Sequence, residues 1–153
     1  MFRIDRLKYR IKSDEGFRSD PYQDTEGVWT IGYGTTWYLS GPVHAFTPAI
    51  ERSEAARLLQ ADVLDAIEDC QYIYEDVFPA LHSVHQEVLI CLAYQLGRKG
   101  LIGFKRMNKA IHNLDYAGWL VELKDSKLYR QATNRCDRYV TAIVQAAWPT
   151  INR

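Results

Sequence analysis

Three residues near the start of the chain have the types and the spacing needed to hydrolyse a glycosidic bond. Glu15 is followed nine residues later by Asp24, and Thr30 lies six residues beyond that. Glycoside hydrolysis needs two carboxyl groups on opposite sides of the scissile bond, and one of them must be protonated to assist the leaving oxygen. Each residue alone is uninformative, because Asp, Glu and Thr are common structural residues in helix ends, turns and strands. Their significance depends on the elements that hold them.

The local sequence predicts that a helix end faces a small β-hairpin or three-stranded sheet. Apolar residues at positions 2, 4, 7 and 11 have near-helical spacing, and Gly16 is a suitable stop, so a helix over 2–15 ends near Glu15. Turn residues and β-formers follow from position 21, with a turn at 24–27 that leads into a strand at 28–34. If the apolar side chains at 29, 31 and 33 pack inward, Thr30 faces the opening on the other side of the strand.

The rest of the chain predicts helices, which gives an α+β fold. Apolar residues recur at helical spacing between positions 58 and 67, and again from 84 to 96, where they suggest a buried central helix that ends at Gly97. We expect one domain over 1–153, made of a β-containing lobe at 16–50, a connecting helix at 51–78 and a helical lobe at 79–153. The helix at 2–15 should pack near the helical lobe, and a ligand should lie in a cleft between the lobes.

The composition is that of a globular protein, with 47% apolar and 25% charged residues, which argues against disorder and fibres. Apolar runs are far shorter than the roughly 20 residues that cross a bilayer, and the start does not resemble a cleavable signal peptide. Three cysteines, Cys70, Cys91 and Cys136, cannot all pair internally, which favours a reducing compartment during synthesis.

The formal net charge is zero but unevenly distributed along the chain. Residues 1–97 carry a net charge of −7, whereas residues 98–153 carry eleven Lys and Arg against four Asp and Glu, a net charge of +7. A basic half suits an acidic polymer, which could be a nucleic acid or a bacterial wall that bears peptide carboxylates. It could equally be a solvated helical surface, so it gives only weak support for nucleic-acid binding, and we expect no nucleic-acid partner.

The region around Glu15 resembles the active site of the T-even-type phage lysozymes, glycoside hydrolase family 24. The matching residues are E-G-F-R at 15–18 and Y-Q-D-T-E-G-V-W-T-I-G-Y-G at 22–34. The resemblance continues through 60–66, through Tyr94 to Gly97 with Gly103-Phe104, and through 131–135, so that it covers nearly the whole chain. It implies a lysozyme-like fold.

The resemblance also implies a function and a set of residues. In the family, Glu, Asp and Thr at this spacing form the catalytic triad, which maps onto Glu15, Asp24 and Thr30. The family implies a muramidase that cuts the β-1,4 bond between N-acetylmuramic acid and N-acetylglucosamine in peptidoglycan, without metal or cofactor. Candidate substrate-binding residues match positions that line the cleft in relatives: Tyr94, Gln95 and Arg135. Alternative roles stay open for these three, as a core tyrosine, a helix-end hydrogen bonder and a surface ion pair.

Three other features bear on the site. Relatives usually have His where this chain has Thr35, so any ion pair of that histidine with a carboxylate is absent, and Asp62 would be the lost partner. Trp37 and Tyr38 are extra aromatic residues, for which packing on the lobe is favoured over stacking on sugars. His82 and His85 could share a helix face, but no third ligand lies nearby in sequence. A solvated histidine pair is therefore the preferred interpretation, and we expect no metal site.

The residues also predict a mechanism. Glu15 at a helix end should be partly desolvated and therefore protonated, whereas Asp24 in a polar turn should be ionised. Thr30 could share a water molecule with Asp24, so we expect inversion, with the two carboxyl groups roughly 6.5 to 9.5 Å apart. Two alternatives remain: a non-catalytic wall-binding or tail-associated protein, and an enzyme for a related amino-sugar polymer such as chitosan.

The expected biological setting follows from the resemblance. We expect a monomeric endolysin, made in the host cytoplasm without stable membrane insertion, that acts on the cell wall in the periplasm after release. Such a protein needs a holin or an injection device to reach the wall, and its action would lyse the host.

Overall fold

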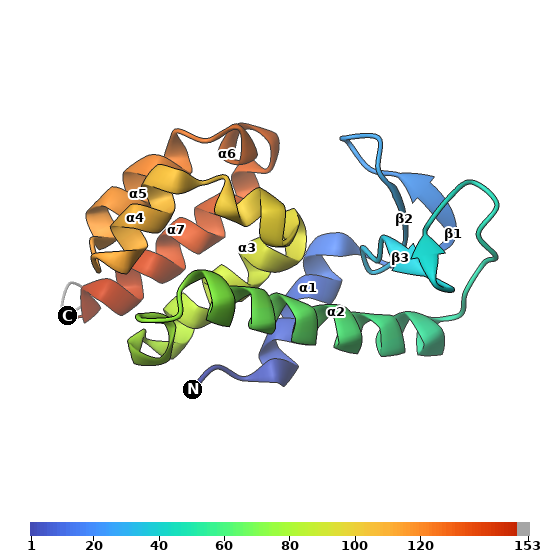
Figure 1. Cartoon of the computed structure of the whole chain (residues 1–153), viewed down its shortest axis with the longest axis horizontal. Coiled ribbons are helices and arrows are strands. Elements are labelled where there is room, and N and C mark those ends of the chain that lie inside the picture. The colour runs from blue at the N-terminus through green and yellow to red at the C-terminus, as the bar shows by residue number, and fades with distance from the viewer. Residues whose placement is uncertain (150–153) are drawn as a thin grey trace. The chain divides into compact units, whose positions relative to one another are not determined.

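The computed structural model describes residues 1–149 and confirms the α+β class (Figure 1). The chain forms two compact units. The N-terminal unit comprises Ile4–Asp65, and the helical unit comprises Met1–Arg3 with the chain from Ala66 onward. No helix within residues 1–149 has the length and apolar character needed to span a bilayer.

The N-terminal unit begins with α1 (Ile4–Glu15), which buries Leu7 and Ile11. The helix ends at Glu15 because the next residue, Gly16, has a positive φ of 68°, and the Gly16 N–H bonds to Lys12 O at 2.9 Å. Two antiparallel strands follow, β1 (Arg18–Gln23) and β2 (Trp29–Gly32). Their pairing places Tyr22 directly opposite Thr30 and contains one irregularity, between Arg18 and Tyr22.

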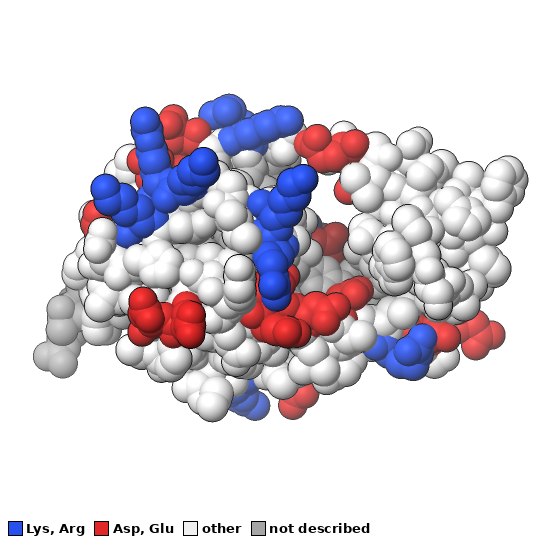
Figure 2. All heavy atoms as spheres, viewed as in Figure 1, with Lys and Arg blue, Asp and Glu red and all other residues white. Residues whose placement is uncertain are grey.

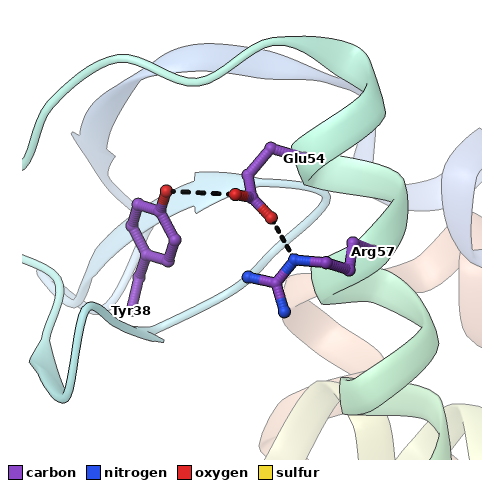
Figure 3. A network of polar contacts seen from close by, with 3 residues as sticks. All are labelled: Tyr38, Glu54 and Arg57. Carbon is purple, nitrogen blue, oxygen red and sulfur yellow. Dashed lines mark hydrogen bonds and ion pairs between the residues drawn. The ribbon is translucent and has the colours of Figure 1, made fainter.

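A second hairpin, β3 (Trp37–Tyr38) with β4 (Gly41–Pro42), follows the first. Its tip residues Leu39 and Ser40 both have positive φ, 56° and 62°, a conformation in which Gly and Asn are preferred. Tyr38 points from β3 to α2, where its hydroxyl donates to Glu54 at 3.4 Å, and Arg57 pairs with the other oxygen of that carboxylate (Figure 3). This contact fixes the hairpin on the helix.

The long helix α2 (Arg52–Ile73) ends earlier than the sequence suggested. The chain then turns over residues 74–77 and continues as the short 3₁₀ helix η1 (Phe78–Ala80), with Pro79 in its first turn. Tyr74 is fully buried at this turn, and its hydroxyl bonds to Asn108 at 2.6 Å. The predicted connecting segment at 51–78 is therefore a helix only as far as Ile73.

The helical unit is built around α3 (Ser83–Ile102), which packs against α7 (Thr133–Ala147). Gly97 interrupts α3 with φ 72° and ψ 169°, after which the chain is helical again to Ile102, beyond the end that the sequence suggested. The remaining helices are α4 (Lys105–His112), α5 (Tyr116–Lys124) and α6 (Lys127–Gln131), drawn in yellow to orange in Figure 1. The largest fully buried side chains of this core are Tyr74, Leu89, Ile90, Leu92, Leu101, Met107, Ile111, Trp119 and Leu123.

All three cysteines are buried, and none forms a disulfide within residues 1–149. Burial raises the pKa of the Cys136 thiol to about 11 and that of Cys70 further still. Cys70 and Cys136 are therefore protonated core side chains at neutral pH.

Candidate active site

Glu15 is the last residue of α1, and its side chain is half-buried. The carboxyl group packs over Gly34, so closely that a Cβ added at that glycine would lie 3.3 Å from Oε2 and 3.4 Å from Cδ. Gly34 also has φ +94°, which side-chain-bearing residues rarely adopt. The turn that follows β2 thus needs a glycine both for its backbone and for room beside Glu15.

Asp24 lies in the exposed turn between β1 and β2, where the backbone holds its carboxylate. Oδ1 accepts the N–H groups of Glu26 at 2.9 Å and Val28 at 2.8 Å. The backbone N–H of Asp24 in turn bonds to Val28 O at 2.9 Å, and Gly27 closes the turn with a positive φ of 78°. No hydrogen bond within residues 1–149 involves Oδ2, so this oxygen is available to a ligand or water.

Thr30 on β2 is buried, with 4% of its surface exposed. Its hydroxyl donates to Val28 O at 2.9 Å, the same carbonyl that accepts from the backbone of Asp24. Val28 therefore ties Thr30 and Asp24 together through main-chain atoms. Because the hydroxyl hydrogen is used, Thr30 can offer its lone pairs to another donor.

Tyr22 is a residue of the site that the spacing argument did not single out. Burial raises its pKa, and the negative charges of Glu15 and Asp24 raise it further, against the opposing effect of Arg18. The phenol is thus within electrostatic reach of both carboxylates. The guanidinium of Arg18 lies 4.3 Å from the centre of its ring. The sequence signal that could have identified Tyr22 was its position two residues before Asp24. In the structure it pairs with Thr30 across the two strands.

Thr35 and Asp62 are in direct contact, although Thr35 cannot form an ion pair with this carboxylate. Thr35 is buried, and its hydroxyl donates to Asp62 Oδ2 at 2.6 Å. Burial raises the pKa of Asp62, the hydrogen bond from Thr35 lowers it, and the charge of Asp65 raises it again. The carboxylate of Asp62 is therefore bound by a neutral donor.

The three expected substrate-binding residues lie in the helical unit. Tyr94 and Gln95 are half-buried on α3, shortly before the break at Gly97, and Arg135 is half-buried in the first turn of α7. Within the described residues, Gln95 Oε1 is buried without a hydrogen-bond partner. A buried acceptor without a partner is costly, so this atom suits a donor from a ligand or water.

His82 and His85 do not form the solvated pair that the sequence suggested. His82 caps α3 by accepting the Val84 N–H at 3.1 Å, whereas His85 is 1% exposed and its Nε2 lies 3.0 Å from Ile143 O. Burial lowers the pKa of His85, which favours the neutral ring. Within residues 1–149, no group of three or more His, Cys, Asp or Glu side chains is arranged to hold a metal ion.

The model of the phage lysozyme family matches residues 12–144, which includes the whole of the site just described. The chain belongs to this family. Membership supports a glycoside hydrolase of the lysozyme type, with the peptidoglycan substrate that the family implies. It also confirms the resemblance that the motif at 15–34 suggested.

Individual relatives come from phages and from a eukaryote. "Probable T4-type lysozyme 2" of Dictyostelium discoideum is 27% identical over 159 residues, which cover 90% of this chain and 93% of that protein. The endolysin of Salmonella phage P22 is 31% identical over 94 residues, 61% of this chain and 62% of the endolysin. The pre-baseplate central spike protein Gp5 of Enterobacteria phage T4 is 28% identical over 88% of this chain, but the match covers only 26% of the spike protein.

Proposed function

We propose that this phage lysozyme family member is an endolysin-type muramidase. It hydrolyses the β-1,4 bond between N-acetylmuramic acid and N-acetylglucosamine with inversion, and Glu15, Asp24 and Thr30 are its catalytic residues. The observation that carries the proposal is the shared anchoring of Asp24 and Thr30 to Val28, in the same unit as a half-buried Glu15.

Glu15 is suited to donate the proton to the leaving oxygen. Its half-buried position penalises the charged form of the side chain. As the last residue of α1 it also lies at the negative end of the helix dipole, which disfavours a carboxylate there. Both effects favour the protonated form that a general acid requires.

Asp24 and Thr30 are suited to hold the attacking water. Oδ2 of Asp24 can accept one hydrogen of the water, and the lone pairs of Thr30 can accept the other, which leaves an oxygen lone pair for the anomeric carbon. As the C–O bond forms, Asp24 accepts a proton from the water, while Glu15 gives its proton to the departing sugar oxygen. The bond is thus exchanged in one displacement with inversion.

Substrate contacts in the helical unit complete the proposal. The unpartnered Oε1 of Gln95 can accept an N–H from an acetamido group, and Tyr94 and Arg135 supply an aromatic ring and a charge. In its biological setting, the protein is a monomer that is synthesised in the host cytoplasm. It reaches the wall in the periplasm through a holin lesion or an injection device and lyses the host.

A second function is favoured by one comparison. The match to a part of the central spike protein of phage T4 favours, as the alternative, a non-catalytic wall-binding or tail-associated protein. The presence of Glu15, Asp24 and Thr30 favours the enzyme, because a protein that only binds has no chemical need of all three.

The test is hydrolysis of purified peptidoglycan, followed by identification of the new reducing ends. A muramidase exposes N-acetylmuramic acid, whereas an enzyme for chitosan-like polymers should prefer chitosan when both are offered. Glu15→Gln should lose activity by at least about 100-fold without loss of folding, since it removes only the proton donor. The matched control is Glu51→Gln, which neutralises an exposed carboxylate of the same unit and should keep normal activity. No release of reducing ends by the unmodified protein would leave the wall-binding function instead.

A further inference from the structure

A surface pocket of about 400 Å³ lies in the N-terminal unit, and none of Glu15, Asp24 and Thr30 lines it. Its walls come from α1, the segment before β1, the residue after β2 and the first residue of α2. The lining side chains are Tyr9, Lys12, Ser13, Phe17, Tyr33 and Arg52. They include aromatic rings, a hydroxyl and two cations but no carboxylate.

The two cations and two of the rings form a row. The guanidinium of Arg52 lies 4.5 Å from the ring centre of Phe17, and the Lys12 ammonium lies 5.5 Å from that of Tyr33. The two ring centres are 5.6 Å apart, with an angle of 51° between the ring planes. Each of the two neighbouring rings therefore has a positive charge against it.

Neither cation is neutralised by the protein itself. Within residues 1–149, no ion pair or hydrogen bond involves the side chain of Lys12 or Arg52, whose contacts are with the rings. A guanidinium that stacks on a ring keeps its N–H groups available at its edge, where a carboxylate can bind with two hydrogen bonds. The geometry thus suits a ligand with two anionic groups separated by a short, partly apolar stretch, rather than one compact anion.

We propose that this pocket is an accessory wall-binding site that holds the carboxylates of peptidoglycan stem peptides between Arg52 and Lys12. The proposal rests on the proposed function, because hydrolysis of peptidoglycan brings these peptides to the protein. A stem peptide is short and extended and carries several carboxylates along its length. Binding at the pocket and at the catalytic residues together would keep the enzyme on the wall between cleavages, since the second contact is then intramolecular.

The first experiment measures binding to purified sacculi in a Glu15→Gln background, so that the wall is not degraded. The pocket variant is Lys12→Gln with Arg52→Gln. The matched control is Lys8→Gln with Arg10→Gln. It also removes two positive charges, both from α1, and neither residue lines the pocket. Each variant is also tested on sacculi whose carboxyl groups have been converted to amides.

We expect the pocket variant to bind native sacculi roughly three- to tenfold more weakly than the control, as the loss of two partly exposed ion pairs implies. On amidated sacculi the two variants should bind alike. Equal binding of both variants to native sacculi would overturn the proposal. A difference that persists on the amidated wall would also overturn it, because the ligand would not be a carboxylate.

A second experiment needs no pocket variant and so does not depend on how that variant folds. A synthetic stem peptide with free carboxylates is titrated into the Glu15→Gln protein, and the ring signals of Phe17 and Tyr33 are followed by NMR. Saturable shifts that are absent with the amidated peptide support the site, whereas no shift, or an equal response to inorganic phosphate, contradicts it. Since this readout requires no turnover, failure of the proposed hydrolysis and failure of the pocket can be told apart.

Discussion

Val28 organises the polar half of the site although its own side chain takes no part in the chemistry. Its N–H holds Asp24 Oδ1, and its carbonyl accepts from both the Asp24 backbone and the Thr30 hydroxyl. The hydroxyl can rotate only by giving up this bond. The arrangement fixes the direction of the Thr30 lone pairs before any water arrives, which reduces the ordering needed in the transition state.

This geometry predicts the stereochemistry and a graded response at Asp24. Asp24→Asn should be severely impaired, because an amide cannot accept the proton of the water. Asp24→Cys should keep more activity, since a thiolate can still orient or activate water. NMR of the first product gives its anomeric configuration, and we expect the α anomer from this β-linked polymer. A β product would mean retention and would contradict the water-holding role of Asp24 and Thr30.

Thr35 and Asp62 give a second residue-level effect, on stability rather than catalysis. Asp62 has a raised pKa, so the folded protein binds its proton more tightly than the unfolded chain does. Its contribution to stability is therefore complete below the unfolded pKa of about 3.9 and declines as pH rises through the folded pKa. The hydrogen bond from Thr35 opposes this decline because it stabilises the ionised form.

Removal of that hydrogen bond should destabilise the protein most at neutral pH. Thr35→Val is expected to lower the free energy of unfolding by about 1.5 to 3 kcal/mol at pH 7, with a smaller effect near pH 3, where Asp62 is protonated. Denaturant unfolding at both pH values measures this. In an Asp62→Asn background the cost of Thr35→Val should depend little on pH. The same cost at both pH values in the unmodified background would exclude an ionised Asp62 as the acceptor.

At the scale of elements, the position of Glu15 depends on how closely α1 approaches the turn after β2. Gly34 allows this approach, with φ +94° and the Glu15 carboxyl beside the position that a Cβ would occupy. The motif contained this glycine, but its spatial relation to Glu15 could not be derived from spacing, because it depends on how α1 packs on the sheet.

Gly34→Ala should therefore impair both stability and turnover. We expect a loss of roughly 1–2 kcal/mol from the strained backbone, together with a lower kcat at little-changed KM, because the added methyl displaces the proton donor. The control is Gly41→Ala in β4, where an added Cβ has no atom within 4 Å and φ is not positive. Denaturation midpoints of both variants measure the loss of stability, and initial rates measure the loss of turnover. A normal kcat in Gly34→Ala would show that Glu15 does not need the space left by the missing side chain of Gly34.

Other elements show where the sequence was sufficient and where it was not. The stop at Gly16 and the turn before β2 were predictable because glycine and turn residues act locally. The prediction that Trp37 packs on the lobe was wrong, because 62% of its surface is exposed on β3. The burial of His85 was missed because the residues that surround it, Tyr116, Trp119 and those of α7, are distant in the sequence.

At the scale of the whole molecule, the main feature is the uneven distribution of charge along the chain, which no single site explains. Figure 2 shows Lys and Arg side chains gathered over α4–α6 of the helical unit. Residues 98–153 carry a net charge of +7, and these residues include Arg135. Peptidoglycan bears peptide carboxylates, so attraction to this surface should add to affinity without any specific contact.

The dependence of activity on salt tests this attraction. The Debye length falls from about 30 Å at 0.01 M to about 8 Å at 0.15 M ionic strength, so attraction between exposed charges becomes largely screened over this range. Hydrolysis of sacculi should slow several-fold as salt rises, mainly through a higher KM. Hydrolysis of the same sacculi with amidated carboxyl groups should be nearly independent of salt, which serves as the control for effects of salt on folding or on the catalytic residues. Equal rates on native sacculi at low and near-physiological salt would mean that the basic half is a solvated surface without a part in wall binding.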